Sequence, residues 1–354
     1  MTDTWDDTAP VRLGHLTLSA PTALAPMAAL TDTVFRRLVK RQGGCGFVVT
    51  EMVASEALVR NVPQAKALLR YHPEERPIGG QIMGARPEVM AEAARMIEAL
   101  GFDFIDVNMG CPARRIVAGG GGSALMRDLA LTESILTAIR RAVAIPLTIK
   151  IRAGWSESCQ NAPEVARVGE LSGAVLVAVH ARTRSDAYRP FVREEILTAT
   201  RRAVGIPVIA NGDIRDHEGA RAVLARTGCD GIMAGRGAVA NPWLFHEIAT
   251  GEEGVATAAR ARGWILDHFS ILREEFAPTQ VMSKLKTFSG WYTRGLLSGA
   301  RLRERIQTLK TPEQFREAVE EFFASYPAEV PPGTLARGAA VGDEDPIDDG
   351  EAVA

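Results

Sequence analysis

The segment IGGQIMGARPEVMAEAARMIEALGFDFIDVNM, residues 78–109, contains one complete strand–helix–strand unit. Its two ends, Ile78–Ile82 and Phe104–Met109, are short apolar runs of the kind found in buried strands. Between them, Pro87-Glu88 opens a stretch with helical periodicity that extends to Leu100 and is followed by a glycine. Helical crossovers between buried strands build a parallel sheet, so this segment predicts an α/β protein.

The same alternation continues on both sides of this segment. Helix starts are indicated at Thr31-Asp32 and Thr132-Glu133, and Ile-Pro pairs at 145–146 and 206–207 precede the next strands. Eight strands are predicted: Thr22–Ala25, Gly46–Glu51, Ile78–Ile82, Phe104–Met109, Leu147–Ile151, Leu176–His180, Val208–Ala210 and Gly231–Ala234. Eight βα units in about 230 residues are typical of a (β/α)8 TIM barrel. No Gly-x-Gly-x-x-Gly follows the first strand, which argues against a dinucleotide-binding Rossmann domain.

The strand pattern stops near Gly254. Amphipathic helices at Ala258–Phe276, Val281–Leu296 and Pro312–Phe323 predict a small all-α helical domain after the barrel. The last stretch is acidic, rich in Ala and Gly and without aromatic residues, so it cannot bury enough apolar area to offset its conformational entropy. The expected organisation is a disordered acidic N-terminus at 1–10, the barrel at 11–253, the helical domain at 254–327 and a disordered acidic tail at 328–354.

The composition is that of a soluble globular protein. Of 354 residues, 46% are hydrophobic and 24% charged, which excludes collagen-like and disordered chains. The four cysteines lie far apart without a CxxC pair, which argues against a zinc ribbon or an iron–sulfur cluster and suits a reducing compartment. The acidic N-terminus is unlike a signal peptide, and no apolar run reaches the roughly 18–20 residues of a membrane span. We therefore expect a cytoplasmic protein that does not bind membranes.

Charge is unevenly distributed along the chain. The net charge is −2 overall but +7 over residues 11–327, because both ends are acidic. Residues 281–310 carry seven bases and one acid, Glu304. Such a segment is compatible with a polyanionic partner, although a charge run alone more often marks a solvated helix face.

Polar side chains gather where the predicted strands end. In a TIM barrel these ends share one mouth, where substrates and cofactors bind. The residues are Asn108 and Cys111 after the fourth strand, Lys150 on the fifth, His180 and Arg182 after the sixth, Asn211, Gly212 and Asp213 after the seventh, and Gly235 and Arg236 after the eighth. Each alone has an ordinary structural explanation, such as a snorkelling lysine or a turn. Their convergence favours a functional site.

The last two strand ends predict a phosphate site. Glycines there allow backbone N–H groups to approach an anion closely, and Arg236 adds positive charge. A phosphate site beside an inward lysine suggests flavin mononucleotide (FMN), because a cation stabilises the anionic reduced ring. Lys150 is placed to supply that cation.

These residues, in this order, resemble the tRNA-dihydrouridine synthases, most closely the bacterial B subfamily. The likeness covers roughly residues 11–325 and includes Asn-Met-Gly-Cys-Pro-Ala at 108–113. Other matching segments are Ala25-Pro26-Met27-Ala28 with Thr31-Asp32, Thr50-Glu51-Met52, Gln81-Ile82-Met83-Gly84, Gly122-Ser123-Ala124-Leu125, Lys150 to Trp155, His180 with Arg182-Thr183, Ala210 to Ile214, Gly235-Arg236-Gly237, Trp291-Tyr292, Gly295-Leu296 and Arg303.

The resemblance implies an FMN-dependent barrel enzyme that reduces specific uridines in tRNA to 5,6-dihydrouridine with NADPH or NADH. It implies that Cys111 is the general acid, and that Asn108 and Arg182 bind the uracil. It implies FMN contacts from Pro26, Met27, Ala28, Gln81, Lys150, His180, Asn211, Gly212, Asp213, Gly235 and Arg236. The helical domain would bind tRNA through its basic segment, with Lys284, Lys286 and Arg303 as candidate contacts. No obligate protein partner is implied, and we expect a monomer.

The residue types fit this chemistry independently. Hydride transfer from flavin N5 to uridine C6 creates an enolate that needs a proton at C5 from the opposite face. A thiol on a mobile loop, here Cys111 followed by the glycines at 119–122, can deliver that proton near neutral pH. The alternative for Cys111 is an inert buried thiol.

The chain departs from the family pattern at three places, Ala181, Arg189-Pro190-Phe191 and Thr287-Phe288, which affect expected substrate and tRNA contacts. Two other functions stay open. One is an FMN barrel that reduces a small pyrimidine, which leaves the basic helices unexplained. The other is an RNA-binding module on a degenerate barrel, against which the intact Cys111, Lys150 and Arg236 argue.

Overall fold

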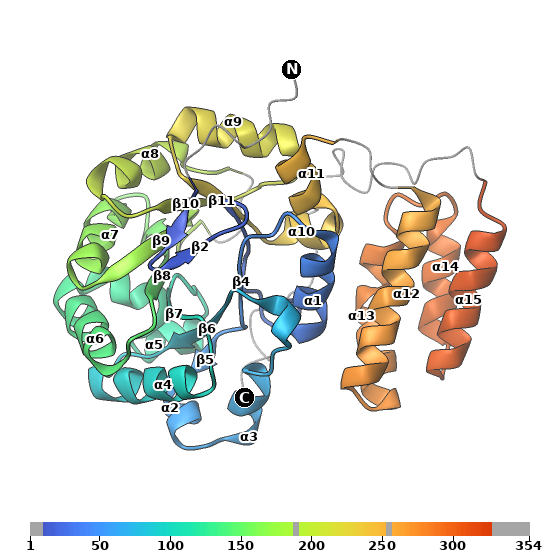
Figure 1. Ribbon diagram of the computed structural model, residues 1–354, viewed down its shortest axis with the longest axis horizontal. Helices are drawn as coiled ribbons and strands as arrows, with labels where there is room; N and C mark the ends of the chain where they lie inside the picture. Colours follow the sequence, from blue (N-terminus) through green and yellow to red (C-terminus); the bar gives the residue numbers. More distant parts are fainter. Residues whose placement is uncertain (1–9, 187–190, 253–256, 328–354) are drawn as a thin grey trace.

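A computed structural model describes residues 10–186, 191–252 and 257–327. Its centre is a parallel sheet in the order β3-β11-β10-β9-β8-β7-β6-β4, and a bridge between Ala23 and Phe47 joins the first and last of these strands (Figure 1). The predicted barrel is therefore confirmed. The strands are β3 (Thr22–Leu24), β4 (Val48–Val49), β6 (Ile78–Met83), β7 (Phe104–Met109), β8 (Leu147–Gly154), β9 (Ala174–Thr183), β10 (Val208–Asn211) and β11 (Gly231–Ala234).

The second predicted strand is the one that differs. In place of a continuous strand at 46–51, β4 is short and a second piece, β5 (Val53–Ala54), pairs with the far end of β6. The chain breaks at Thr50 because its side-chain Oγ1, in place of a backbone carbonyl, accepts the N–H of Gln81 at 3.0 Å. Glu51 then turns inward and accepts the N–H of Ala29 at 2.5 Å.

A short hairpin precedes the barrel. It comprises β1 (Arg12–Leu13) and β2 (Leu16–Thr17), which pair antiparallel. Leu13 is fully buried and belongs to a cluster of inward side chains that includes Phe47 and Phe104. Because side chains on alternate strand positions point inward, this cluster fills the end of the barrel opposite the carboxyl ends of the strands.

Helices surround the barrel. The longer ones are α1 (Thr33–Gln42), α4 (Pro87–Ala99), α6 (Leu129–Ala142), α7 (Ala162–Leu171), α8 (Glu194–Ala203) and α9 (His217–Thr227). The predicted start of α1 is confirmed, since the side chain of Asp32 accepts the N–H of Phe35. The predicted start of α6 lies three residues too late. Asp128 caps this helix, and the hydroxyl of Thr132 instead donates to the carbonyl of Leu125.

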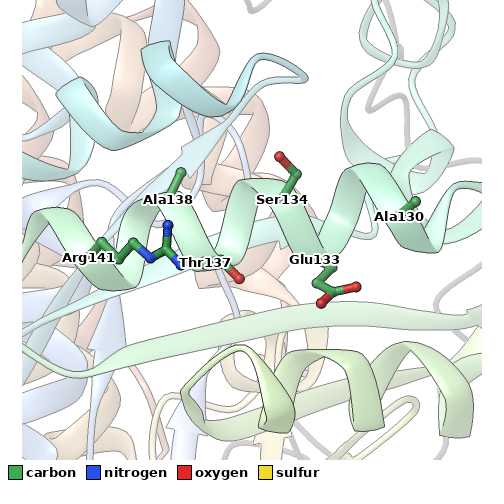
Figure 2. Close-up of a pocket in the computed structure, with 6 residues that line it drawn as sticks. All are labelled: Ala130, Glu133, Ser134, Thr137, Ala138 and Arg141. Carbon is green, nitrogen blue, oxygen red and sulfur yellow. The ribbon is translucent and has the colours of Figure 1, made fainter.

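Shorter helices also occur in this layer. They are α2 (Ser55–Val59), α3 (Pro63–Leu68), α5 (Arg114–Ala118), α10 (Arg236–Ala240) and α11 (Leu244–Thr250). A hollow of about 380 Å³ lies on the outer layer and is lined only by α6 residues such as Glu133 and Arg141 (Figure 2).

Within residues 257–327, four helices follow the barrel, which agrees with the predicted all-α domain but includes one helix, Gly299–Thr308, that was not predicted. They are α12 (Ala258–Glu275), α13 (Pro278–Thr293), α14 (Gly299–Thr308) and α15 (Pro312–Ala324). The helix predicted to reach Leu296 ends three residues earlier, before Gly295, whose φ of 76° is a left-handed conformation that favours glycine. The predicted boundary at 253/254 and both predicted disordered ends, 1–10 (apart from Pro10) and 328–354, lie outside the described residues.

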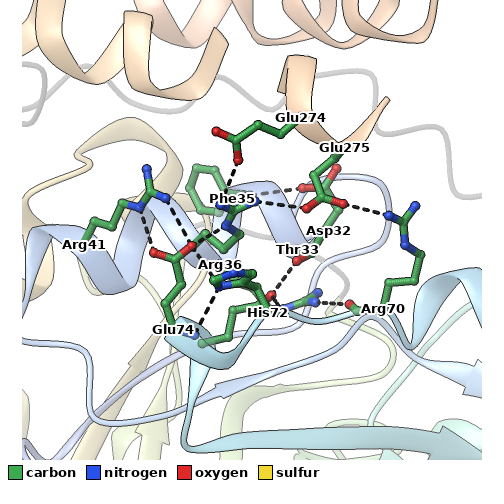
Figure 3. Close-up of polar contacts among 12 residues, drawn as sticks. Asp32, Thr33, Phe35, Arg36, Arg41, Arg70, His72, Glu74, Glu274 and Glu275 are labelled. Carbon is green, nitrogen blue, oxygen red and sulfur yellow. Dashed lines mark hydrogen bonds and ion pairs between the residues drawn. The ribbon is translucent and has the colours of Figure 1, made fainter. Parts of the chain in front are cut away.

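The helical bundle rests on α1 at one side of the barrel (Figure 1). Arg37 of α1 pairs with Glu74 and, at 3.0 Å each, with Glu274 and Glu275 near the end of α12 (Figure 3). Phe35 stacks on Phe288 of α13, with ring centroids 5.9 Å apart. Ionic and aromatic contacts therefore both attach the bundle to the corner that follows β3.

A fully buried ion pair supports this corner from within. Arg36 donates to Glu75 at 2.6 Å, and their side chains are 1% and 0% exposed. The same guanidinium also donates to the carbonyls of Thr31 and Arg70. Each of its three nitrogens thus donates a hydrogen bond that helps to hold the segments around α1 together (Figure 3).

No helix among the described residues is both long and apolar enough to span a bilayer.

Candidate active site

A chain of buried hydrogen bonds crosses the barrel mouth between β6 and β7. Asp106 accepts from the hydroxyl of Thr148 at 2.6 Å and from the side-chain amide of Gln81 at 2.7 Å. The Oε1 atom of Gln81 accepts from Nδ2 of Asn108 at 3.0 Å. Asp106 and Asn108 lie two residues apart on one strand and therefore face the same interior. Burial raises the pKa of Asp106, and the two donated hydrogen bonds oppose that rise.

This chain ends on the loop that carries Cys111. Oδ1 of Asn108 accepts the N–H groups of Gly110 at 3.1 Å and Cys111 at 2.9 Å. From the other side, the buried Arg152 donates to the carbonyl of Gly110 at 2.6 Å and to that of Thr183 at 3.1 Å. The backbone at Cys111 is therefore held on both sides, while its side chain remains partly exposed at the mouth.

The glycine-rich segment after Cys111 folds back onto it. The N–H of Ser123 donates to the carbonyl of Cys111 at 3.0 Å. Gly122 has a φ of 56°, and a Cβ atom there would lie 2.7 Å from the same carbonyl oxygen. Glycine at this position is therefore required for the loop to close against the thiol residue.

Lys150 and His180 lie on adjacent strands of the same mouth. Nζ of Lys150 donates to Oδ1 of Asn211 at 3.1 Å, and Nδ2 of Asn211 donates to the carbonyl of Met233 at 2.8 Å. Burial, followed by the nearby charge of Arg152, lowers the pKa of Lys150 to about 8. Burial and the neighbouring cations also hold the pKa of His180 well below its ordinary value, so this ring is neutral at neutral pH.

A second polar group follows β9, β10 and β11. Arg182 is 1% exposed and donates to Asp213 at 2.6 Å, with Nε2 of His180 3.4 Å from its other terminal nitrogen. Arg236 approaches the same carboxylate at 3.8 Å and is partly exposed. Both arginines therefore approach the same carboxylate.

Two glycines pack tightly against neighbouring side chains beside these charges. A Cβ atom on Gly212 would lie 2.9 Å from Val192, and one on Gly235 would lie 3.1 Å from Sδ of Met27. Gly212 has a φ of 142°, and Asp213, which is not glycine, has a φ of 48°. Glycine at both positions therefore lets neighbouring side chains pack closely against the backbone of these loops.

The loop after β3, residues 26–28, lies against this group. The N–H of Met27 donates to the hydroxyl of Thr31 at 2.8 Å, and Glu51 holds the next turn through Ala29. Sδ of Met27 lies in contact range of the space next to Gly235. The predicted cofactor and substrate residues of the barrel therefore converge on one mouth, from β3, β6, β7, β8, β9, β10 and β11.

The three predicted tRNA contacts of the helical bundle lie in different settings. Nζ of Lys284 pairs with Asp32 at 2.6 Å and lies 4.7 Å from the ring centroid of Phe276. Lys286 is half-buried on α13, and Arg303 is exposed on α14. Lys284 thus attaches the bundle to the barrel, whereas Arg303 faces solvent.

The residues that differ from the family pattern lie in different parts of the structure. Ala181 is buried, and its carbonyl accepts the N–H of Arg193 at 2.7 Å. Phe288 lies in the interface with α1, so of the pair at 287–288 only Thr287 is exposed. Arg189-Pro190 lies outside the described residues.

Three functional positions were not assigned roles from the sequence. They are Asp106, Arg152 and Glu51, which position the side chains and loops described above. The role of Asp106 could have been predicted from the sequence, because a carboxylate two residues before Asn108 on a buried strand must face the barrel interior. Within the described residues, no group of three or more His, Cys, Asp or Glu side chains is arranged to bind a metal ion.

Two known structures have a similar fold, and in each case the match covers about half of the solved chain. The complex of 2-naphthoyl-CoA reductase with 2-naphthoyl-CoA superposes with a TM-score of 0.55 at 15% identity, over 69% of this chain and 52% of that one. Histamine dehydrogenase from Rhizobium sp. 4-9 gives 0.53 at 15% identity, over 74% and 50%. At this level of identity the likeness establishes the fold alone.

Sequence relatives are much closer. The chain is 38% identical over 323 residues to a probable tRNA-dihydrouridine synthase of Rickettsia conorii, covering 89% of this chain and 97% of that protein. It is 39% identical over 319 residues to tRNA-dihydrouridine synthase B of Pseudomonas aeruginosa, covering 89% and 96%. The family model for dihydrouridine synthase (Dus) matches residues 23–326. The chain that carries this barrel mouth and its Cys111 loop therefore belongs to the dihydrouridine synthase family.

Proposed function

We propose that this protein reduces specific uridines of tRNA to 5,6-dihydrouridine, with FMN as cofactor and NADPH or NADH as reductant, in the cytoplasm. The observation that carries the proposal is the position of Cys111. Its backbone is held by Asn108 and Arg152 at the mouth that also contains Lys150 and His180. Family membership supports the same reaction class.

The residues of the mouth fit a flavin mononucleotide. Gln81, Lys150 and His180 would contact the ring, which Pro26, Met27 and Ala28 would line. The ribityl phosphate would lie against Gly212 and Gly235, where a side chain would meet Val192 or Met27, with Asn211, Asp213 and Arg236 around it. Neutral His180 and charged Lys150 offer one uncharged and one cationic partner to the heteroatoms of the ring.

Each protein group has a distinct task in the reaction. A bound, reduced FMN supplies hydride at C6 of the uracil ring. Asn108 and Arg182 would bind and orient the uracil, and both are already fixed by Gln81 and Asp213. Cys111 would donate a proton to C5 from the opposite face, as general acid. The clamped backbone at Cys111 keeps the sulfur within a narrow region of the mouth, which reduces the entropic cost of that step.

The competing function is reduction of a free pyrimidine by the same mouth. The two functions are separated by supplying the purified protein with NADPH and either unmodified tRNA, uridine or orotate. We expect dihydrouridine, quantified by mass spectrometry of the digested tRNA, only with tRNA. Turnover of orotate or uridine with no reaction on tRNA would contradict the proposal. A wild-type protein without flavin absorbance, even after incubation with FMN, would favour the non-enzymatic RNA-binding module.

Arg236→Ala is expected to weaken FMN binding by about 1.5–3 kcal/mol, because alanine cannot form the charge-assisted hydrogen bond to phosphate. The affinity is measured by titrating apoprotein with FMN and following flavin fluorescence. Arg226→Ala is the matched control, since Arg226 is an exposed arginine paired with Glu194 on the outer layer. Equal FMN affinity of the two variants would mean that the FMN phosphate does not bind at Arg236.

Lys150 is expected to make FMN binding depend on pH. Because its pKa is about 8, the side chain is an ammonium below that pH and a neutral amine above it. Affinity for FMN should therefore fall as the pH rises through about 8 in the wild type. Lys150→Met should bind FMN more weakly, with no change over the same interval. Parallel pH profiles for the two proteins would show that Lys150 is not a cationic ring contact.

A further inference from the structure

Two arginines and a tryptophan form a cluster on the rim of the barrel, here named the rim cluster: Arg127, Trp155 and Arg184. The guanidinium carbons of Arg127 and Arg184 lie 4.7 Å and 4.9 Å from the centroid of the Trp155 ring. Arg127 is exposed, and Arg184 and Trp155 are partly exposed. The predicted flavin contacts and the predicted tRNA contacts of the helical bundle do not include these three residues.

The backbone places the rim cluster at the mouth, close to Cys111. Trp155 directly follows β8, and Arg184 directly follows β9 and donates its N–H to the carbonyl of Gly154 at 2.9 Å. Arg127 ends a 3-10 helix, Gly122–Arg127, whose start is bonded to the Cys111 carbonyl through Ser123. All three chain segments therefore lie at the carboxyl ends of the strands, where substrate enters.

The rim cluster and the helical bundle lie on opposite sides of that mouth. In the closed strand order, β8 and β9 stand across the barrel from β3 and β4. The bundle is attached to α1, which follows β3, through Arg37 and Lys284. Figure 1 shows the same arrangement, with α12–α15 beside α1 and with α6, α7 and β8 on the far side of the barrel.

The charge of the rim cluster is not balanced by acids. In the described ranges, neither Arg127 nor Arg184 forms an ion pair with a carboxylate, although many other arginines of the chain do. Two guanidinium groups next to one ring repel each other, and an anion that contacts both would remove that repulsion. A guanidinium stacked on an aromatic ring keeps its in-plane N–H groups available, which suits bidentate contact with phosphate. Arg114 and Arg115 of α5, three and four residues after Cys111, are exposed and extend the positive surface.

We propose that the rim cluster is a second RNA-binding surface, which contacts backbone phosphates next to the target uridine on the side of the mouth away from the helical bundle. The inference rests on the proposed function. With one positive surface on each side, the RNA spans the mouth and the uridine between the two contacts lies above Cys111. Holding both flanks also favours the extrusion of a base from its stack, because the backbone on each side is fixed.

The test compares tRNA affinity over a series of salt concentrations. Arg127→Ala/Arg184→Ala is expected to weaken binding roughly tenfold and to reduce the slope of log K against log salt by roughly 0.7–0.9 for each phosphate that the variant no longer neutralises. Trp155→Leu should have a smaller effect in the same direction, because it removes the ring that orders both arginines. Arg141→Ala is the matched control, as an exposed arginine on the outer face of α6 (Figure 2), and should bind as the wild type does.

The flavin content of each variant reports correct folding of the mouth. Unchanged tRNA affinity and slope in the double variant, with full flavin content, would overturn the proposal. So would an increase in the KM for NADPH with unchanged tRNA affinity, since the cluster would then bind the dinucleotide. Failure of the proposed function is seen separately, because the wild-type protein would then form no dihydrouridine. If the double variant still lowered the salt dependence of tRNA binding in that case, the rim cluster would remain an RNA-binding surface.

Discussion

Replacement of Cys111 by alanine is expected to slow dihydrouridine formation by about 10²–10⁴-fold, the usual contribution of a general acid. Reduction of the flavin by NADPH should be unaffected, because no proton from Cys111 enters that half-reaction. The backbone contacts of residue 111 involve its N–H and carbonyl, to Asn108 and Ser123, and alanine retains both. The loop should therefore keep its position, and the loss should lie in the chemical step.

The two half-reactions are measured separately in a stopped-flow instrument, first with NADPH alone and then by mixing the reduced protein with tRNA. Cys159→Ala is the control, since this partly exposed cysteine lies in the loop after β8 and has no proposed catalytic role. Reoxidation of Cys111→Ala by tRNA at the wild-type rate would exclude Cys111 as the proton donor. Loss of NADPH oxidation in the same variant would indicate damage to the flavin site.

Arg36→Met is expected to lower the free energy of unfolding by about 3–5 kcal/mol. The substitution leaves the carboxylate of Glu75 buried without its counter-charge, which is the costly way to disrupt a buried ion pair. Replacing both partners removes that charge as well, so Arg36→Met/Glu75→Leu should be more stable than Arg36→Met alone. The effect should appear at the barrel corner to which the helical bundle is attached (Figure 3).

Urea denaturation followed by tryptophan fluorescence measures these differences. Arg41→Met is the matched control, because Arg41 is an exposed residue of the same helix whose pair with Glu74 should contribute less than about 1 kcal/mol. Equal destabilisation by Arg36→Met and Arg41→Met would mean that burial of the Arg36–Glu75 pair is not what makes it important.

The strands could be predicted because seven of the eight are continuous buried runs flanked by helix starts and glycine. The second strand could not, since its pairing at Thr50 uses a side-chain oxygen, which no hydrophobic pattern records. Helix α14 was not predicted, because its hydrophobic pattern is weak. Only Gly299, Leu302 and Ile306 are buried in its ten residues, and its arginines dominate the local composition.

The site was predictable to the extent that it lies at strand ends, because parallel strands bring their carboxyl ends to one mouth whatever the loops do. The contacts that attach the helical bundle to the barrel were harder to predict. Arg37 and Glu274 are 237 residues apart in the chain, and Lys284 and Asp32 are 252 apart. Contacts at such separations depend on how the bundle docks, which sequence periodicity does not specify.

The position of Asp106 has a consequence for altering the enzyme. Asp106 accepts from the side-chain amide nitrogen of Gln81, which leaves Oε1 of Gln81 to accept from Nδ2 of Asn108, so the direction of the first hydrogen bond sets that of the second. Under the proposed function, in which Asn108 binds the uracil, the polarity of Asn108 therefore depends on Asp106, which is not among the proposed substrate contacts. Asn108→Asp would place a carboxylate oxygen next to Oε1 of Gln81, and neither atom can donate a hydrogen bond. A variant with an acceptor at 108 therefore needs the Gln81 amide in the opposite orientation, which requires a different residue at 106 as well.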